Sequence, residues 1–203
     1  MSASSVSFAP PPSNPFATRF TRPGRLAPLD EDGRPLDLDA LLDRVTLLDG
    51  RGAIEGPHGS GKTNLLTALA ARIDERGGDA RLVRVRGTTD AIGVMRGLRE
   101  PRQETVLCID GWERLPWPAA LATRWWAAGR GCGLIVTAHR PTGLPLLHRS
   151  RPSAVVLARI VEQLPGHGGR IRPADIADAF ARHAGDLREA LYDLYDRFER
   201  RAG

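Results

Sequence analysis

The chain has 203 residues, enough for one α/β domain with a substantial core and a small appendage. Its hydrophobic content of 41% and charged content of 26% are those of a soluble globular protein. The net charge of +5 does not by itself indicate a nucleic-acid-binding protein, because 24 acidic residues accompany the basic ones and no dense basic block is present.

An N-terminal arm is predicted for residues 1–35. Residues 1–13 are rich in serine, alanine and proline and are expected to be disordered. The stretch that follows places Phe16 and Phe20 among arginines and turn-forming residues, and it is expected to be extended. Two interpretations stay open: a linker, or a strap that lies over the domain or its ligand with one of these phenylalanines as its anchor.

Helices and strands alternate from residue 36 onward. Apolar residues at helical spacing predict helices over 36–48, 61–77, 89–100 and 118–130. Apolar or alternating stretches predict strands over 52–56, 80–87, 104–111, 132–139 and 153–160, with a short helix or turn over 143–150. This alternation indicates a parallel sheet that is covered by helices on both faces.

The chain ends in two predicted amphipathic helices, over 173–185 and 186–201, with no strand between them. Gly185 is expected to end the first helix, and Asp186 with Glu189 is expected to form a capping box for the second. The predicted fold class is α/β, a three-layer sandwich with a five-stranded parallel sheet and a small C-terminal helical lid. The expected domains are the arm, a core over 36–160 and the lid over 161–203.

Cysteine usage and the absence of membrane signals bear on the compartment. Cys108 and Cys132 lie in apolar stretches typical of buried strands, which predicts free thiols in a reducing cytosol. No signal peptide is recognised near the N-terminus, and no apolar run approaches the ~20 residues that span a bilayer. We expect a cytoplasmic protein.

The stretch GPHGSGKT, residues 56–63, fits the pattern G-x-x-x-x-G-K-[ST] in full and stands between a predicted strand and a predicted helix. Its Lys62 is the only lysine among 29 basic residues. In such a loop the backbone N–H groups and the helix N-terminus face a phosphate, and the lysine reaches it as a compact charge. We expect a nucleotide to contact Gly56, Pro57, His58, Gly59, Ser60, Gly61, Lys62, Thr63 and Asn64.

A second element of nucleotide chemistry is an apolar strand that ends in an acid. The stretch TVLCIDG supplies it, with Asp110 at the end of the strand. Thr63 and Asp110 are therefore the expected ligands of Mg²⁺, which accompanies the phosphates. One whole strand intervenes in the sequence between the loop and this acid, which favours the additional-strand class of P-loop NTPases over small-molecule kinases and GTPases.

From residue 51 onward the chain resembles an AAA+ ATPase, closest to clamp loaders and initiator ATPases. The stretch at 56–63 resembles Walker A, and VLCIDGWERL resembles Walker B. LIVTAHR resembles the sensor 1 strand, LLHRSRPSAVVL the stretch that carries an arginine finger, and HAGDLREAL the sensor 2 segment. The resemblance implies catalytic roles for Thr137 as sensor 1, Arg151 as finger, with Arg149 beside it, and Arg188 as sensor 2.

The resemblance fails at one catalytic position. AAA+ proteins place a glutamate directly after the Walker B aspartate, and this chain has Gly111 there. If the strand stays extended, Glu113 faces the same side as residue 111 and takes the water-positioning role. If the chain turns at Gly111, Glu113 is only a surface residue and hydrolysis is slow or absent.

Other polar and aromatic residues near these motifs have plainer interpretations. His139 follows the predicted fourth strand; transporter ATPases carry a histidine there, but here it is interpreted as a turn residue. Trp125 and Trp126 are expected to supply one core ring and one exposed ring, and a partner-docking surface is the alternative interpretation for the tryptophans after the Walker B strand.

Three functions stay open. The first is an ATP-binding, Mg²⁺-dependent ATPase or ATP-driven switch of AAA+ type, which acts with an oligomer or partner ATPase. The second is a small-molecule kinase in which HRPTGLPLLHRSR closes over phosphates. The third is a nucleotide-binding adaptor that does not hydrolyse. ATP is favoured over GTP because the chain lacks an Asn-Lys-x-Asp motif, and nucleic acid is a weakly supported partner.

Overall fold

The computed structural model describes residues 14–87, 105–166 and 169–201. The predicted helix over 89–100 and the N-terminal stretch 1–13 lie outside these ranges.

A five-stranded parallel sheet forms the centre of the molecule, as the sequence predicted. Its order is β2-β3-β4-β1-β5. The strands are β1 (Arg51–Glu55), β2 (Asp79–Arg84), β3 (Thr105–Asp110), β4 (Gly133–Ala138) and β5 (Leu146–Arg149). Because all pairs are parallel, the carboxyl ends of the strands meet at one edge of the sheet, where ligands of open α/β sheets bind.

The strand that bears the predicted metal acid does not neighbour the strand before the phosphate loop. β4 lies between them, with Ile54 of β1 opposite Thr137 and Ile109 of β3 opposite Val136. The additional-strand prediction is therefore confirmed. The strand that intervenes in the sequence, β2, lies at the edge of the sheet instead.

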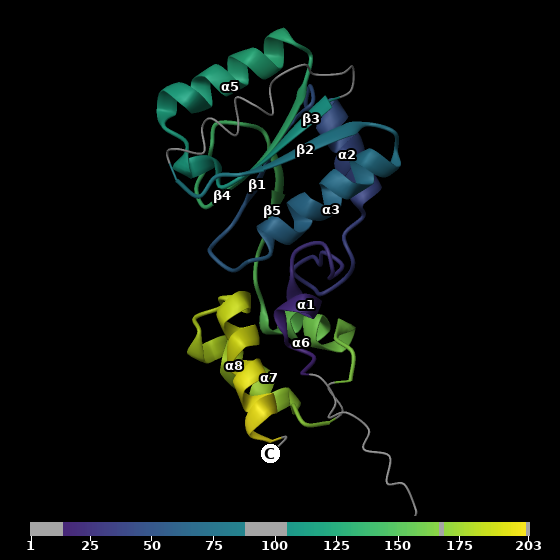
Figure 1. Cartoon of the computed structure of the whole chain (residues 1–203), viewed down its shortest axis with the longest axis vertical. Coiled ribbons are helices and arrows are strands. Elements are labelled where there is room, and N and C mark those ends of the chain that lie inside the picture. Colours follow the sequence, from purple (N-terminus) through teal and green to yellow (C-terminus); the bar gives the residue numbers. More distant parts are fainter. Residues whose placement is uncertain (1–13, 88–104, 167–168, 202–203) are drawn as a thin grey trace, which may run out of the picture.

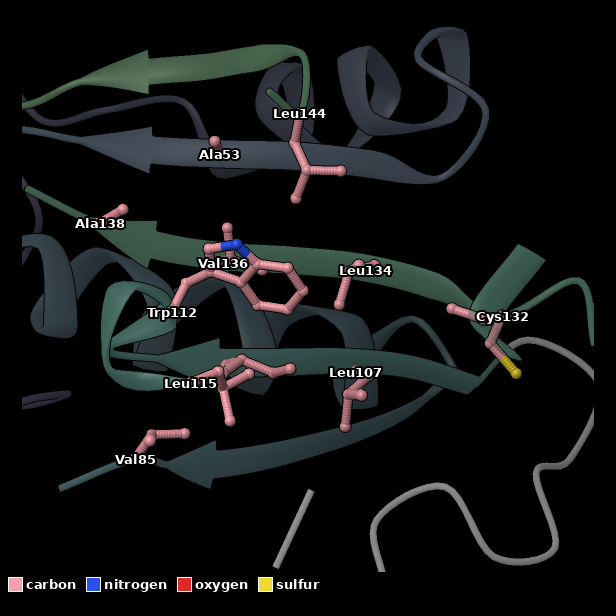
Figure 2. Packing of buried hydrophobic residues seen from close by; sticks show 12 residues of the cluster. Ala53, Val85, Leu107, Trp112, Leu115, Cys132, Leu134, Val136, Ala138 and Leu144 are labelled. Carbon is pink, nitrogen blue, oxygen red and sulfur yellow. The ribbon is translucent and has the colours of Figure 1, made fainter. Parts of the chain in front are cut away.

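Two apolar layers cover the sheet because side chains alternate between its faces along each strand. On one face Leu107, Leu134 and Val136 pack with Trp112 and Leu115 (Figure 2). The helix α5 (Trp117–Gly129) adds Ala127 to the same layer. On the other face lie α2 (Leu38–Leu47) and α3 (Lys62–Glu75), which pack on a layer that includes Ile54, Cys108 and Ile135. Both cysteines are buried and free.

Two predicted elements around residue 150 are wrong. The stretch expected to be a short helix or turn contains β5, and the stretch expected to be the fifth strand is the helix α6 (Ala154–Gln163). Ser153 caps this helix, since its side chain accepts the N–H of Val156. Val156 and Val161 then bury one helical face, so tertiary packing outweighs the strand preference of valine.

The lid helices, α6, α7 (Pro173–Arg182) and α8 (Leu187–Arg200), pack together below the sheet (Figure 1). Gly185 adopts φ of 84° and precedes α8, which fits its predicted role as a helix stop. The capping box is half formed: Asp186 accepts the N–H groups of Arg188 and Glu189, but its own N–H bonds to the carbonyl of His183. The domain boundaries at 35 and 160 remain predictions.

The arm from residue 14 is a strap rather than a free linker. Phe16 is 2% exposed, and its ring lies 6.2 Å from that of Phe198 among the lid helices. The short helix α1 (Thr18–Thr21) follows, and Figure 1 shows it beside α6. Asn64 of α3 then accepts the N–H of Gly24 and donates to the carbonyl of Leu26. The arm thus connects the lid helices to the sheet layer.

The tryptophans divide as expected between core and surface. Trp112, in the short helix η2 (Trp112–Arg114), is buried, and Trp126 is half-buried against the same core. Trp117 and Trp125 are exposed on α5, at 77% and 74%. Within the described ranges, none of the helices is both long and apolar enough to span a membrane.

Candidate functional site

The phosphate loop, residues 56–63, joins β1 to α3 at the carboxyl edge of the sheet. Gly56 permits a close approach by the chain after β5: a Cβ there would lie 2.5 Å from the carbonyl oxygen of Ser150. Gly61 adopts φ of 87° as the N-cap of α3, a left-handed conformation that favours glycine. These two glycines therefore set the entry and exit of the loop.

Lys62 points back into the loop. The residue is 7% exposed, and its Nζ donates to the carbonyls of Gly56, at 2.8 Å, and Pro57. The Nδ1 atom of His139 lies 3.2 Å from the same Nζ. Burial lowers the pKa of Lys62 to about 8, although the nearby carboxylates of Glu113 and Asp110 oppose this shift. The lysine is thus enclosed at the place where a phosphate-binding loop needs its charge.

Ser60 carries an unsatisfied polar atom inside the loop. Its Oγ is buried and has no hydrogen-bond partner within the described ranges. Buried hydroxyl groups are normally paired, so an unpaired one in a loop of this sequence pattern fits a ligand that brings an oxygen. The N-terminus of α3, immediately after Gly61, is suited to an anion. A phosphate group satisfies both features.

The two predicted Mg²⁺ ligands lie together. Thr63 Oγ1 donates to the carboxylate of Asp110, at 3.0 and 3.1 Å from its two oxygens. Thr137 Oγ1, from β4, donates to Asp110 Oδ1 at 2.7 Å and accepts the N–H of Gly111 at 3.0 Å. A hydroxyl and a carboxylate are oxygen donors of the kind that Mg²⁺ prefers. Thr137, predicted as sensor 1, fixes the orientation of the acid.

Of the two alternatives for the chain after Asp110, the structure has the turn at Gly111. The chain does not stay extended after Asp110, because Gly111 adopts φ of 89° and η2 follows. This turn nevertheless brings Glu113 to the site rather than away from it. Its Oε1 lies 3.2 Å from Nε2 of His139, with the glutamate side chain 30% exposed.

His139 is the residue of the cluster that the sequence interpretation missed. It connects Lys62 with Glu113 through its two ring nitrogens, at 3.2 Å each. The ring of His58, from the phosphate loop, lies 3.6 Å from its centroid. Burial and the charge of Lys62 lower the pKa of His139, which favours the neutral ring. Its position directly after a predicted parallel strand was the available signal, because the carboxyl ends of parallel strands meet at one edge of the sheet.

The predicted sensor 2 segment contacts the phosphate loop. A Cβ on Gly59 would lie 1.9 Å from Asp186 Oδ1, so the N-terminus of α8 is seated on the loop at this glycine. Arg188, two residues further on, is exposed, and its charge is close enough to contribute to the lowered pKa of Lys62. This brings a second cationic side chain near the loop from the lid helices.

Two predicted site residues are engaged elsewhere. Arg151 forms an ion pair of 3.0 Å with Glu31 of the arm and is not part of the cluster around Lys62. The neighbouring Arg149 lies 3.4 Å from the carboxylate of Glu55. Asn64 uses its amide group to hold the arm. One cluster thus contains the phosphate loop, Asp110, Glu113 and Thr137. Arg151 and the side chain of Asn64 are not part of it.

Comparisons with known proteins yield a likeness of fold. No protein-family model matches the chain, and no curated protein matches it. The structure of PCH-2 from C. elegans aligns with 11% sequence identity and a TM-score of 0.42, over 81% of this chain and 67% of that chain. Independently of that alignment, the sheet has an AAA+-like strand order, β2-β3-β4-β1-β5, followed by helices that pack together.

Proposed function

We propose that the chain binds ATP with Mg²⁺ at residues 56–63 and hydrolyses it, or uses it as a switch, together with a second copy or a partner ATPase. One observation carries this proposal. A buried lysine and a threonine–aspartate pair meet at the carboxyl edge of a parallel sheet, at the start of a helix. The ammonium of Lys62 is buried against two carbonyls and a histidine nitrogen, and burial of a charge is costly unless it is paired, which supports an anionic ligand at this place.

Each residue of the loop has a role in this proposal. The backbone and Ser60 hold phosphate oxygens, and Lys62 turns from the loop carbonyls to the β- and γ-phosphates. Thr63 and Asp110 hold Mg²⁺, which neutralises phosphate charge when it is bound. Thr137 keeps the carboxylate of Asp110 in place through its hydrogen bond of 2.7 Å.

The turn at Gly111 supports a role for Glu113 in positioning water. His139 lies between its carboxylate and Lys62, at 3.2 Å from each. Arg188 contributes charge from the lid helices. Arg151 faces Glu31 of its own arm, so a finger role requires that it leave this ion pair and act on a neighbour.

The kinase alternative loses its structural support. It needed residues 139–151 as an arginine-rich segment that closes over phosphates. Residues Leu146–Arg149 are instead the strand β5, paired with β1 inside the sheet. The adaptor alternative differs from the ATPase only in hydrolysis, and the test below separates the two. The absence of an Asn-Lys-x-Asp motif continues to favour ATP over GTP.

The test combines nucleotide binding with phosphate release, at low and high protein concentration. Wild-type protein is expected to bind Mg–ATP and to release phosphate at a rate per molecule that rises with concentration, since a finger in trans contributes about 10³–10⁵ in rate. Lys62→Ala is expected to lose both. Binding without release at any concentration would favour the adaptor, and the absence of Lys62-dependent binding would exclude the proposal.

A further inference from the structure

We propose that His139 is a positioning residue that links occupancy of the phosphate loop to the availability of Glu113. This inference rests on the proposed function, because it concerns the same site. It goes beyond that function by assigning a coupling role to a residue to which the AAA+ resemblance gives no role. The evidence is the chain of contacts from Lys62 through His139 to Glu113.

The direction of the hydrogen bonds in this chain follows from the donors that are present. An ammonium group has three hydrogen-bond donors and no acceptor. Three acceptors surround Nζ of Lys62: the carbonyls of Gly56 and Pro57 and Nδ1 of His139. We assign Nδ1 as the acceptor of the third ammonium proton, and not as a donor to the carbonyl of Gly56 at 3.2 Å, so that the proton of the neutral ring is on Nε2. Nε2–H then donates to the carboxylate of Glu113 at 3.2 Å, which holds the glutamate in place.

A bound phosphate competes for the same lysine. When Lys62 turns to phosphate, Nδ1 of His139 loses its donor. The carbonyl of Gly56 lies 3.2 Å from Nδ1 and becomes the available partner for a proton on that atom. The ring changes tautomer through solvent: Nε2 gives up one proton and Nδ1 takes one, so the ring stays neutral. Nε2 then presents a lone pair to Glu113, which is released to hold the attacking water.

The surroundings of His139 are suited to such a change. Its side chain is 24% exposed, so water reaches the ring for proton exchange. The ring of His58, whose centroid lies 3.6 Å away with the two planes tilted by 32°, lies against the imidazole and belongs to the phosphate loop itself. Thr137 lies two residues earlier on β4, where it bonds to Asp110, so the strand that orients the metal acid also positions His139.

The first test reads the tautomer by nitrogen-15 NMR of histidine-labelled protein, with His139→Asn used for assignment. We expect the Nε2–H form without nucleotide and the Nδ1–H form with a non-hydrolysable ATP analogue and Mg²⁺. An Nδ1–H form without nucleotide, or an unchanged tautomer at a saturating analogue, would overturn the inference. Failure of the analogue to bind would refute the proposed function instead, and the form without nucleotide would still test the hydrogen-bond direction.

The second test uses two substitutions, each of which replaces one of the two ring nitrogens by an amide. The amide of His139→Asn reaches the position of Nδ1, and that of His139→Gln reaches the position of Nε2. His139→Gln keeps a donor that faces Glu113 and that nucleotide binding does not remove, so it is expected to reduce kcat about tenfold or more with little increase in KM for ATP. His139→Asn no longer holds Glu113 and is expected to retain kcat. His183→Gln is the matched control, since the His183 ring faces Asp193 of the lid helices at 3.3 Å and not Lys62 or Glu113. An effect of His139→Gln no larger than that of the control, or an equal loss of kcat in His139→Asn, would overturn the inference.

Discussion

At the scale of single residues, the contact between Gly59 and Asp186 joins the phosphate loop to the lid helices. Gly59 adopts φ of 64°, and a Cβ there would lie 1.9 Å from Asp186 Oδ1. We predict that Gly59→Ala costs about 1–2 kcal/mol through its left-handed backbone and more through displacement of Asp186, which caps α8. Urea unfolding measures the loss of stability, and hydrogen exchange of α8 shows whether this helix is loosened.

Gly77 supplies the matched control for this substitution. It also has a left-handed backbone, with φ of 87°, but a Cβ there would meet nothing within 4 Å. Gly77→Ala therefore measures the backbone cost alone. Asp186→Ser shortens the capping side chain and should remove the excess cost of Gly59→Ala. Equal losses for the two glycine substitutions would show that the contact with the lid helices contributes no stability.

At the scale of whole elements, most strands and helices of the sheet layer could be predicted from the sequence, because their apolar patterns reflect burial against the sheet. The apolar run at 105–110 and the long helix after Gly61 lie where expected, because burial and helix-capping signals agree there. The strand predicted over 153–160 was wrong because Val155 and Val156 favour strands locally. The cap at Ser153 and packing among the lid helices stabilise the helix α6 instead.

The site shows the same division between local and long-range information. Lys62, Thr63 and Asp110 are recognisable because their spacing relative to a strand and a helix is local. The role of His139 could not be recognised in this way, since it depends on β4 lying beside β1, which only the sheet order establishes. Glu113 depended on the conformation of Gly111, and a glycine accepts both alternatives at low cost.

The attachment of the arm to the lid helices can be tested by substitution of its phenylalanines. Phe16 is 2% exposed among the lid helices, so we predict that Phe16→Ala destabilises the protein by about 3–5 kcal/mol. The loss should appear as faster hydrogen exchange in α8 and faster proteolysis of the arm. Phe20→Ala, at a half-buried position of the same arm, is expected to cost clearly less. Comparable effects of the two would mean that Phe16 is not the anchor.

At the scale of the molecule, the lid helices have their own apolar cluster and their own ionic network, separate from the two layers on the sheet. Arg201 binds both carboxylate oxygens of Asp175, at 2.7 and 2.8 Å, and Arg197 binds Asp193 at 2.8 Å. All four tryptophans lie at residues 112–126. Tryptophan fluorescence therefore reports on the sheet layer, and hydrogen exchange can report on the lid helices separately.

This separation gives a pH prediction for the lid helices. The bond to Arg201, with the N–H of Arg172, holds the pKa of Asp175 well below its usual value. A lowered pKa in the folded state adds stability above the unfolded pKa of about 3.9, and that stability is lost as the pH falls through the lower folded value. Hydrogen exchange in α7 and α8 should accelerate below about pH 4 before tryptophan fluorescence changes.

Asp175→Asn tests the origin of that acid sensitivity. The variant is expected to be less stable than wild type at pH 7, because Arg201 loses the charge of the buried Asp175, and its stability is expected to depend less steeply on pH below about 4. Asp32→Asn is the control, since Asp32 pairs with Arg34 at 3.5 Å with a side chain 63% exposed and should change neither quantity. An Asp175→Asn protein that retains the full acid slope would place the titrating carboxylates outside this pair, with Asp193 and Asp178 beside Arg197 as the next to substitute.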